Sequence, residues 1–80
     1  MPRYYFHIHD GREILDDDGL ELPDLAAARE MAILNSGEIL KNGAGPGMWA
    51  GEPWRMWVTD EPGGGGKTFF TLQFSATEGE

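Results

Sequence analysis

The sequence predicts a small α+β domain in which one helix packs on one face of an antiparallel sheet built from two β-hairpins, in the order ββαββ. Residues 25–40 carry apolar or small side chains at alternating three- and four-residue steps, which is the period of a helix. Stretches with a period of two lie on both sides of that helix, and glycine-rich turn signals interrupt them. These observations indicate a hairpin, a helix and a second hairpin.

The first hairpin occupies residues 3–15. Residues 3–9 alternate in the manner of a strand, and Asp10-Gly11 is a strong signal for a tight hairpin turn. Residues 12–15 then return as a short second strand. One face of the first strand carries Tyr4, Phe6 and Ile8, and the other face carries Tyr5, His7 and His9.

The helix is expected over residues 24–41. Asp24 is a suitable N-cap, because its carboxylate can accept hydrogen bonds from the open N–H groups of the first turn. Lys41 and the residues after it, Asn42 and Gly43, make a plausible end. The inward face of the helix is rich in alanine, so the helix can lie close to the sheet. This face consists of Leu25, Ala28, Ala32, Asn35 and Ile39.

The second hairpin combines residues 54–60 with residues 68–74. Bringing its two apolar sets together predicts a register with Val58 opposite Phe70 and Met56 opposite Leu72, since a slip of one residue would mix the faces. The predicted core is Tyr4, Phe6, Ile8, Leu25, Ala28, Ala32, Ile39, Met56, Val58, Phe70 and Leu72.

Length and composition limit the domain organisation. With 80 residues we expect a single domain over residues 1–80, a flexible Gly/Pro-rich loop at 42–53 and a frayed tail at 75–80. Cysteine is absent, which excludes disulfides and thiolate sites. Small domains without such cross-links often gain stability from a partner subunit.

Charge bears on the partners. The formal net charge is -8, so we expect no nucleic-acid and no membrane partner. No apolar run approaches a membrane span, and no signal-peptide core follows the first residues, so the expected compartment is the cytoplasm.

Four segments in order carry a family resemblance: Pro2–His7, Asp18–Asp24 with the alanine-rich helix after it, Trp54–Asp60 and Phe69–Phe74. This layout resembles a family of short bacterial proteins described as domain of unknown function 6894. The resemblance implies the fold and the single domain. It implies no activity, ligand or catalytic residue.

Two motifs imitate ligand loops. Gly63–Thr68 resembles the end of a P-loop, but Glu61 occupies the first glycine position and a strand follows instead of a helix, so we expect a hairpin loop that binds no nucleotide. Asp16-Asp17-Asp18-Gly19 resembles a calcium loop, yet the first and last ligand positions fall on Ile14 and Leu25. Turn formation is the favoured interpretation, and a weak contact with a hydrated cation is the alternative.

His7 and His9 are the candidate metal ligands. Two residues apart on a strand, they project from one face with Cα atoms about 6.5–7 Å apart, so both imidazoles could share an ion with Asp10, Asp60 or Glu61. The alternative is that they are polar residues on a half-exposed face. We expect no other cofactor and no enzyme, because Ser36 and Ser75 lie in no nucleophile context.

Aromatic residues dominate the expected interaction surface. The sheet face without the helix would carry Tyr5, His7, His9, Trp57, Thr59, Phe69, Thr71 and Gln73. Stacking of nucleobases is disfavoured by the acidic charge, so the favoured function is a protein-interaction module that forms a homodimer through this face, with Trp57 and Phe69 at its centre. In the alternative, the 42–53 loop covers this face and Trp49 lies across it. A small-ligand or metal-binding domain using His7 and His9 is the second functional class.

Overall fold

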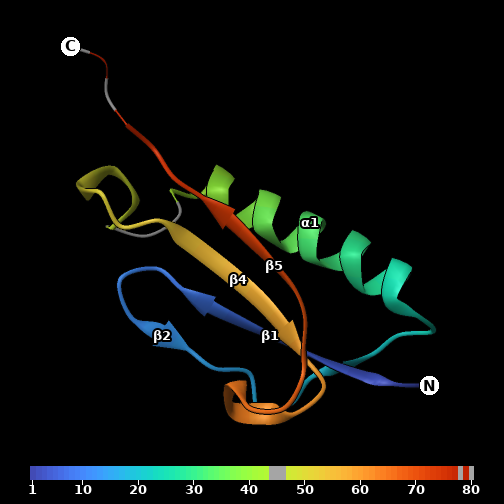
Figure 1. The fold of residues 1–80 in the computed structure, drawn as a ribbon. Coiled ribbons are helices and arrows are strands. Elements are labelled where there is room, and N and C mark those ends of the chain that lie inside the picture. The colour runs from blue at the N-terminus through green and yellow to red at the C-terminus, as the bar shows by residue number, and fades with distance from the viewer. Residues whose placement is uncertain (44–46, 78, 80) are drawn as a thin grey trace.

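Five antiparallel strands and one α-helix make up the part of the chain that the structure describes, which is residues 1–43, 47–77 and 79 of a computed structural model (Figure 1). The α+β class with a single helix on one antiparallel sheet is therefore confirmed. The elements are β1 (Arg3–His9), β2 (Glu13–Ile14), β3 (Leu20–Glu21), α1 (Leu25–Lys41), the 3-10 turn η1 (Met48–Ala50), β4 (Trp54–Thr59), the 3-10 turn η2 (Pro62–Gly64) and β5 (Thr68–Phe74). The order differs from ββαββ in one detail, because Leu20–Glu21 forms an extra short strand before the helix.

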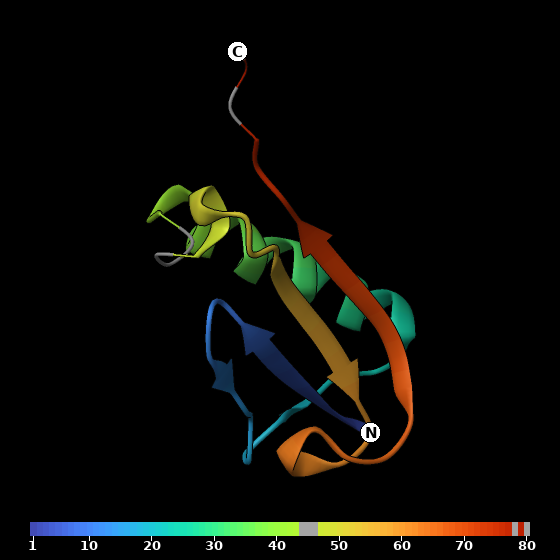
Figure 2. The ribbon, with the colours of Figure 1, turned by 60° about the vertical axis from the view of Figure 1, so that its left-hand side comes forward.

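The strands run in the order β2-β1-β4-β5 (Figure 2). The short strand β3 pairs with the other end of β1. Phe6 of β1 lies opposite Val58, and Val58 lies opposite Phe70 of β5. Met56 lies opposite Leu72, so the predicted register of the second hairpin is confirmed. Both hairpins thus belong to one sheet.

The helix begins as expected. Asp24 is the N-cap, and its Oδ1 accepts a hydrogen bond from Ala27 N at 2.9 Å. Ala28 and Ala32 are fully buried against the sheet. Ser36, which the sequence analysis left out of the core, is also buried and donates to Met56 Sδ at 3.7 Å.

The core lies between α1 and the sheet in two neighbouring clusters. Ala32, Trp54 and Met56 form one cluster, and Tyr4, Ala28 and Val58 form the other. Trp54 was missed as a core residue, although it shares the inward face of β4 with Met56 and is only 1% exposed. The remaining predicted core residues pack at the margins of these clusters and are half-buried: Phe6, Ile8, Leu25, Ile39, Phe70 and Leu72.

The long segment after the helix is anchored at η1, where Met48 packs against the first cluster. Flexibility of 42–53 and fraying of 75–80 stay predictions, and residues 44–46, 78 and 80 within them lie outside the described residues. Within the described ranges, no helix combines the length and the apolar character that crossing a membrane requires.

Candidate functional site

The sheet face opposite α1 is covered in part by the chain itself. Two segments, residues 15–19 and 61–64, lie over this face, and we call them the cover layer. They are joined by a hydrogen bond from Gly63 N to Asp16 O of 3.3 Å, and they meet at one end of the sheet (Figure 1). The expectation of a fully open face is therefore wrong over β1.

His7 lies beneath the cover layer and is 0% exposed. Asp16 N donates to His7 Nδ1 at 3.0 Å, and His7 Nε2 lies 2.8 Å from Thr59 Oγ1. The Thr59 hydroxyl in turn donates to Glu61 O at 2.7 Å. Because Nδ1 is an acceptor here, the neutral ring carries its proton on Nε2 and donates it to Thr59.

Burial lowers the pKa of His7 below its ordinary value of 6.5, although the Asp16 carboxylate beside it acts in the opposite direction. The neutral form also fits the hydrogen bonds, because a proton on Nδ1 would face the N–H of Asp16. His7 therefore joins the strand to both segments of the cover layer as a neutral group.

Asp16 ties the cover layer to the edge of β1. Its Oδ2 accepts from Phe6 N at 3.1 Å, and its Oδ1 accepts from the N–H groups of Asp18 and Gly19 at 3.0 and 3.1 Å. Burial alone raises the pKa of Asp16, but these backbone hydrogen bonds outweigh burial and hold the pKa below its ordinary value of 3.8. The carboxylate is thus an ionised part of the fold.

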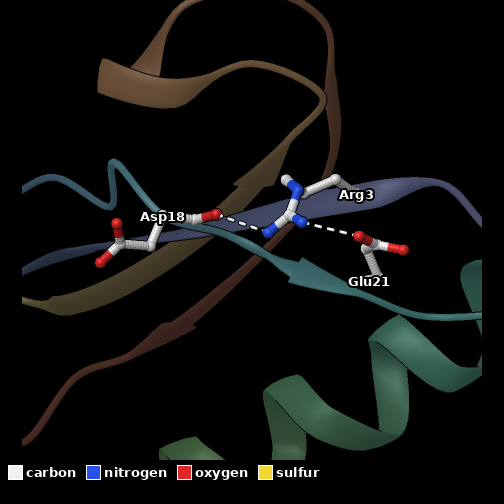
Figure 3. A network of polar contacts seen from close by, with 3 residues as sticks. All are labelled: Arg3, Asp18 and Glu21. Atoms are coloured by element: carbon white, nitrogen blue, oxygen red, sulfur yellow. Dashed lines mark hydrogen bonds and ion pairs between the residues drawn. The ribbon is translucent and has the colours of Figure 1, made fainter.

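Arg3 fastens the end of the same segment. Its guanidinium donates to Asp18 O at 2.8 Å and to Glu21 Oε1 at 2.7 Å (Figure 3). Both side chains of the ion pair are about half exposed, at 43% and 50%, so the pair contributes little stability by itself.

Two predicted interaction residues lie against the cover layer. A Cβ added to Gly19 would lie 2.8 Å from Tyr5 Cε2, so the backbone passes directly along the edge of this ring. Trp57 is half-buried, and its indole lies near Gly64, which also approaches Leu15. The His7 ring lies 5.3 Å from the Trp57 ring, measured between centroids. Tyr5 and Trp57 are thus partly occupied by intrachain contacts.

Phe69 does not lie on the helix-free face. The pairing between β4 and β5 shifts between Val58 and Thr59, so that Phe69 becomes the extra residue of a β-bulge. Its ring packs against Tyr4 in the core, with centroids 5.4 Å apart. The prediction of Phe69 at the centre of an aromatic face is therefore wrong, because a bulge breaks the strict alternation of side chains.

Trp49 does not cover Trp57 either. It lies on η1 and is 62% exposed, whereas its neighbour Met48 is the residue that packs inward. The backbone of Gly64 lies near Trp57 instead, since a Cβ added there would lie 3.7 Å from Trp57 Cζ2.

The proposed metal ligands are not positioned as a site. Both ring nitrogens of His7 already hold hydrogen bonds, and His9 Nδ1 accepts weakly from Gly11 N at 3.4 Å. In the described part of the chain, no group of three or more His, Asp or Glu side chains is arranged to hold a metal ion. The geometry gives the pair no support as metal ligands.

The surface that sequence reasoning missed is the outer edge of β5. Among the described residues β5 pairs with β4 alone, and Figure 2 shows it along one margin of the sheet. Its seven residues, Thr68–Phe74, include no charge and no proline. Charged side chains and proline are the features by which edge strands normally discourage pairing with another chain.

The directions of the backbone N–H and C=O groups of β5 can be derived from the hydrogen bonding of β1 and from the strand registers. Phe6 N donates to Asp16, on the side away from β4, so the Phe6–Val58 pair exchanges no backbone hydrogen bonds. The backbone N–H and C=O groups of Val58 and Met56 therefore point toward β5. Those of their partners, Phe70 and Leu72, point toward β4. By the same alternation, the N–H and C=O groups of Thr71 and Gln73 point outward from the sheet.

An open depression adjoins this edge on the helix-free face. It has a volume of about 410 Å³ and is lined by Arg55, Trp57, Thr68, Thr71 and Gln73. The Arg55 guanidinium lies 4.9 Å from the centre of the Trp57 ring, a cation–π distance. The edge and the depression form one continuous uncovered area.

Comparison with known proteins agrees with the family resemblance. The family model described as "Domain of unknown function (DUF6894)" matches residues 3–75. No curated protein and no solved structure matches the chain. The match spans nearly all of the 80 residues, and the chain belongs to this family of unknown function.

Proposed function

We propose that the protein is a non-enzymatic protein-interaction module that binds an extended strand of a protein partner along the outer edge of β5. The observation that carries this proposal is a seven-residue edge strand without charge or proline, with the backbone groups of Thr71 and Gln73 directed outward. Addition of a strand to such an edge is a common mode of peptide recognition, in which main-chain hydrogen bonds supply affinity and neighbouring side chains supply specificity.

The side chains beside the edge suit a strand partner. Phe70, Leu72 and Phe74 are half-buried on the helix side, so a partner strand would remove more of their apolar surface from water. On the other side, Arg55 and Trp57 offer a cation and an aromatic ring within the depression. This placement moves the proposed contact from the centre of the helix-free face to its open margin.

The absence of catalytic function is part of the proposal. The buried histidine that would serve as a general base has both ring nitrogens engaged, with Asp16 N and with the Thr59 hydroxyl. For the same reason, a site built on His7 and His9 is not proposed as a second function.

Selection from a displayed library of random peptides tests the proposal. Dilute wild-type protein should recover peptides that bind Gln73→Thr equally well but lose at least about tenfold in affinity on Gln73→Pro, which corresponds to ~1.4 kcal/mol. Proline removes the outward N–H of residue 73, and an edge strand tolerates proline at such a position. Recovery of no binders, or of binders insensitive to Gln73→Pro, contradicts the proposal.

A further inference from the structure

We infer that the strand which occupies the β5 edge is β5 of a second copy, paired antiparallel about a two-fold axis at Leu72. The inference rests on the proposed function and names the partner. It would join two five-stranded sheets into one continuous sheet, with both helices on the same face.

The register follows from the outward groups. Only Thr71 and Gln73 present outward N–H and C=O groups within the regular part of β5, Phe70–Phe74, because the bulge displaces Phe69. An antiparallel pair of identical strands that matches these residues places Thr71 opposite Gln73 of the second copy, and Gln73 opposite Thr71. Every outward group of the regular segment then finds a partner, and the axis passes through Leu72.

The same register matches the side chains. On the helix side, Leu72 meets Leu72, and Phe70 meets Phe74 of the other copy. Directly opposite residues of antiparallel strands have Cβ atoms about 4.5–5.5 Å apart, and aromatic pairs there stabilise the sheet. A register centred on Thr71 would place the bulged Phe69 opposite Gln73, and one centred on Gln73 would run past the end of β5 at Phe74.

The charge of the chain opposes association of two copies, but this charge lies outside the strands that would pair. The formal net charge of -8 makes two copies repel, yet Thr68–Phe74 contains no charged residue, so the strands themselves meet without like charges. The repulsion comes from the rest of the chain and is screened by salt. Association of two copies should therefore strengthen as salt rises from low to moderate concentration.

The test combines sedimentation with engineered thiols. The chain has no cysteine, so introduced thiols can link only to each other. Hydrogen-bonded partners have Cα atoms about 5.5 Å apart, within disulfide range, whereas residues offset by two lie about 7–8 Å apart. Mixed Thr71→Cys and Gln73→Cys chains should therefore give a mixed disulfide dimer at least about fivefold more abundantly than either variant alone.

Each outcome is decisive. Three results together support the inference: wild-type dimers strengthen with salt, they weaken about tenfold or more on Gln73→Pro but not on Gln73→Thr, and the mixture cross-links at least about fivefold more than either single variant. Equal cross-linking in single variants overturns the Leu72 register. A monomer at high micromolar concentration overturns the second copy as occupant, and the peptide selection then decides separately whether the edge binds a strand at all.

Discussion

The carboxylate of Asp16 accepts a hydrogen bond from the backbone N–H of Phe6, at 3.1 Å from Oδ2 to N. On this side of β1, β2 pairs at Ile8 and β3 pairs at Tyr4, so Phe6 lies in the interval between them. The Asp16 side chain thus accepts the hydrogen bond of a backbone N–H group that neither β2 nor β3 pairs with. Asp16 thus covers this part of β1, whereas β5 pairs with β4 alone among the described residues.

Asp16→Ala should lower the free energy of unfolding by about 3 kcal/mol, because it removes a carboxylate that accepts from three backbone N–H groups. Asp17→Ala is the matched control; its side chain is exposed, and a change within about 0.5 kcal/mol is expected. Urea unfolding of both variants measures the difference. Equal effects would mean that Asp16 contributes only its charge.

Acidification should destabilise the protein through His7. Its pKa is lowered by burial in the folded state, so the unfolded chain binds the proton more readily between the folded pKa and 6.5. The stability from this group is complete above 6.5 and is lost as the pH falls through that window. Asp16 adds a further loss only below its ordinary pKa of 3.8.

The matched variant is His7→Gln, which cannot titrate. Between about pH 7.5 and about pH 5, the urea midpoint of the wild type should fall more than that of His7→Gln. Parallel curves for the two proteins would show that His7 has the same proton affinity in both states.

Gly19→Ala should be destabilising by at least about 1–2 kcal/mol, because its φ of +69° lies in the left-handed region and the new Cβ would collide with Tyr5 and Arg3. Gly37→Ala is the opposite control. Gly37 lies within α1 with no atom within 4 Å of an added Cβ, so alanine should stabilise by about 0.5–1 kcal/mol. Thermal unfolding of the two variants should shift in opposite directions. A melting temperature of Gly19→Ala equal to or above that of the wild type would contradict this close approach.

Zinc should leave the melting temperature unchanged at about tenfold molar excess, because a ligand stabilises a protein only if it prefers the folded state. In that state both ring nitrogens of His7 are engaged by Asp16 N and by the Thr59 hydroxyl. Calorimetry with and without zinc measures the shift. A rise in the melting temperature that disappears in His7→Ala would restore the metal hypothesis.

The period-two pattern predicted the faces of β1 and β4 and the register of β4 with β5, because one buried face determines how strands pair. The pattern failed at Phe69, since a bulge adds a residue without leaving a mark in an alternating sequence. It also failed at His7, whose burial depends on Asp16, nine residues away, and on the turn after Thr59.

The sequence itself contains a feature that indicates the open edge of β5. A last strand without charge or proline is unusual for a sheet margin, but its position depends on which strand occupies the other side of β4. That place belongs to β1, which leaves β5 outermost. Non-local pairing of this kind cannot be deduced from local periodicity.

Amide hydrogen exchange at Thr71 and Gln73 tests the central claim most directly, because their N–H groups are the ones directed out of the sheet. The N–H of Leu72 faces β4 and serves as the internal reference. We predict fast exchange of Thr71 and Gln73 in dilute protein, and protection of both at high concentration, while Leu72 stays protected throughout. Exchange at Thr71 and Gln73 that does not change with protein concentration would contradict pairing of the β5 edges.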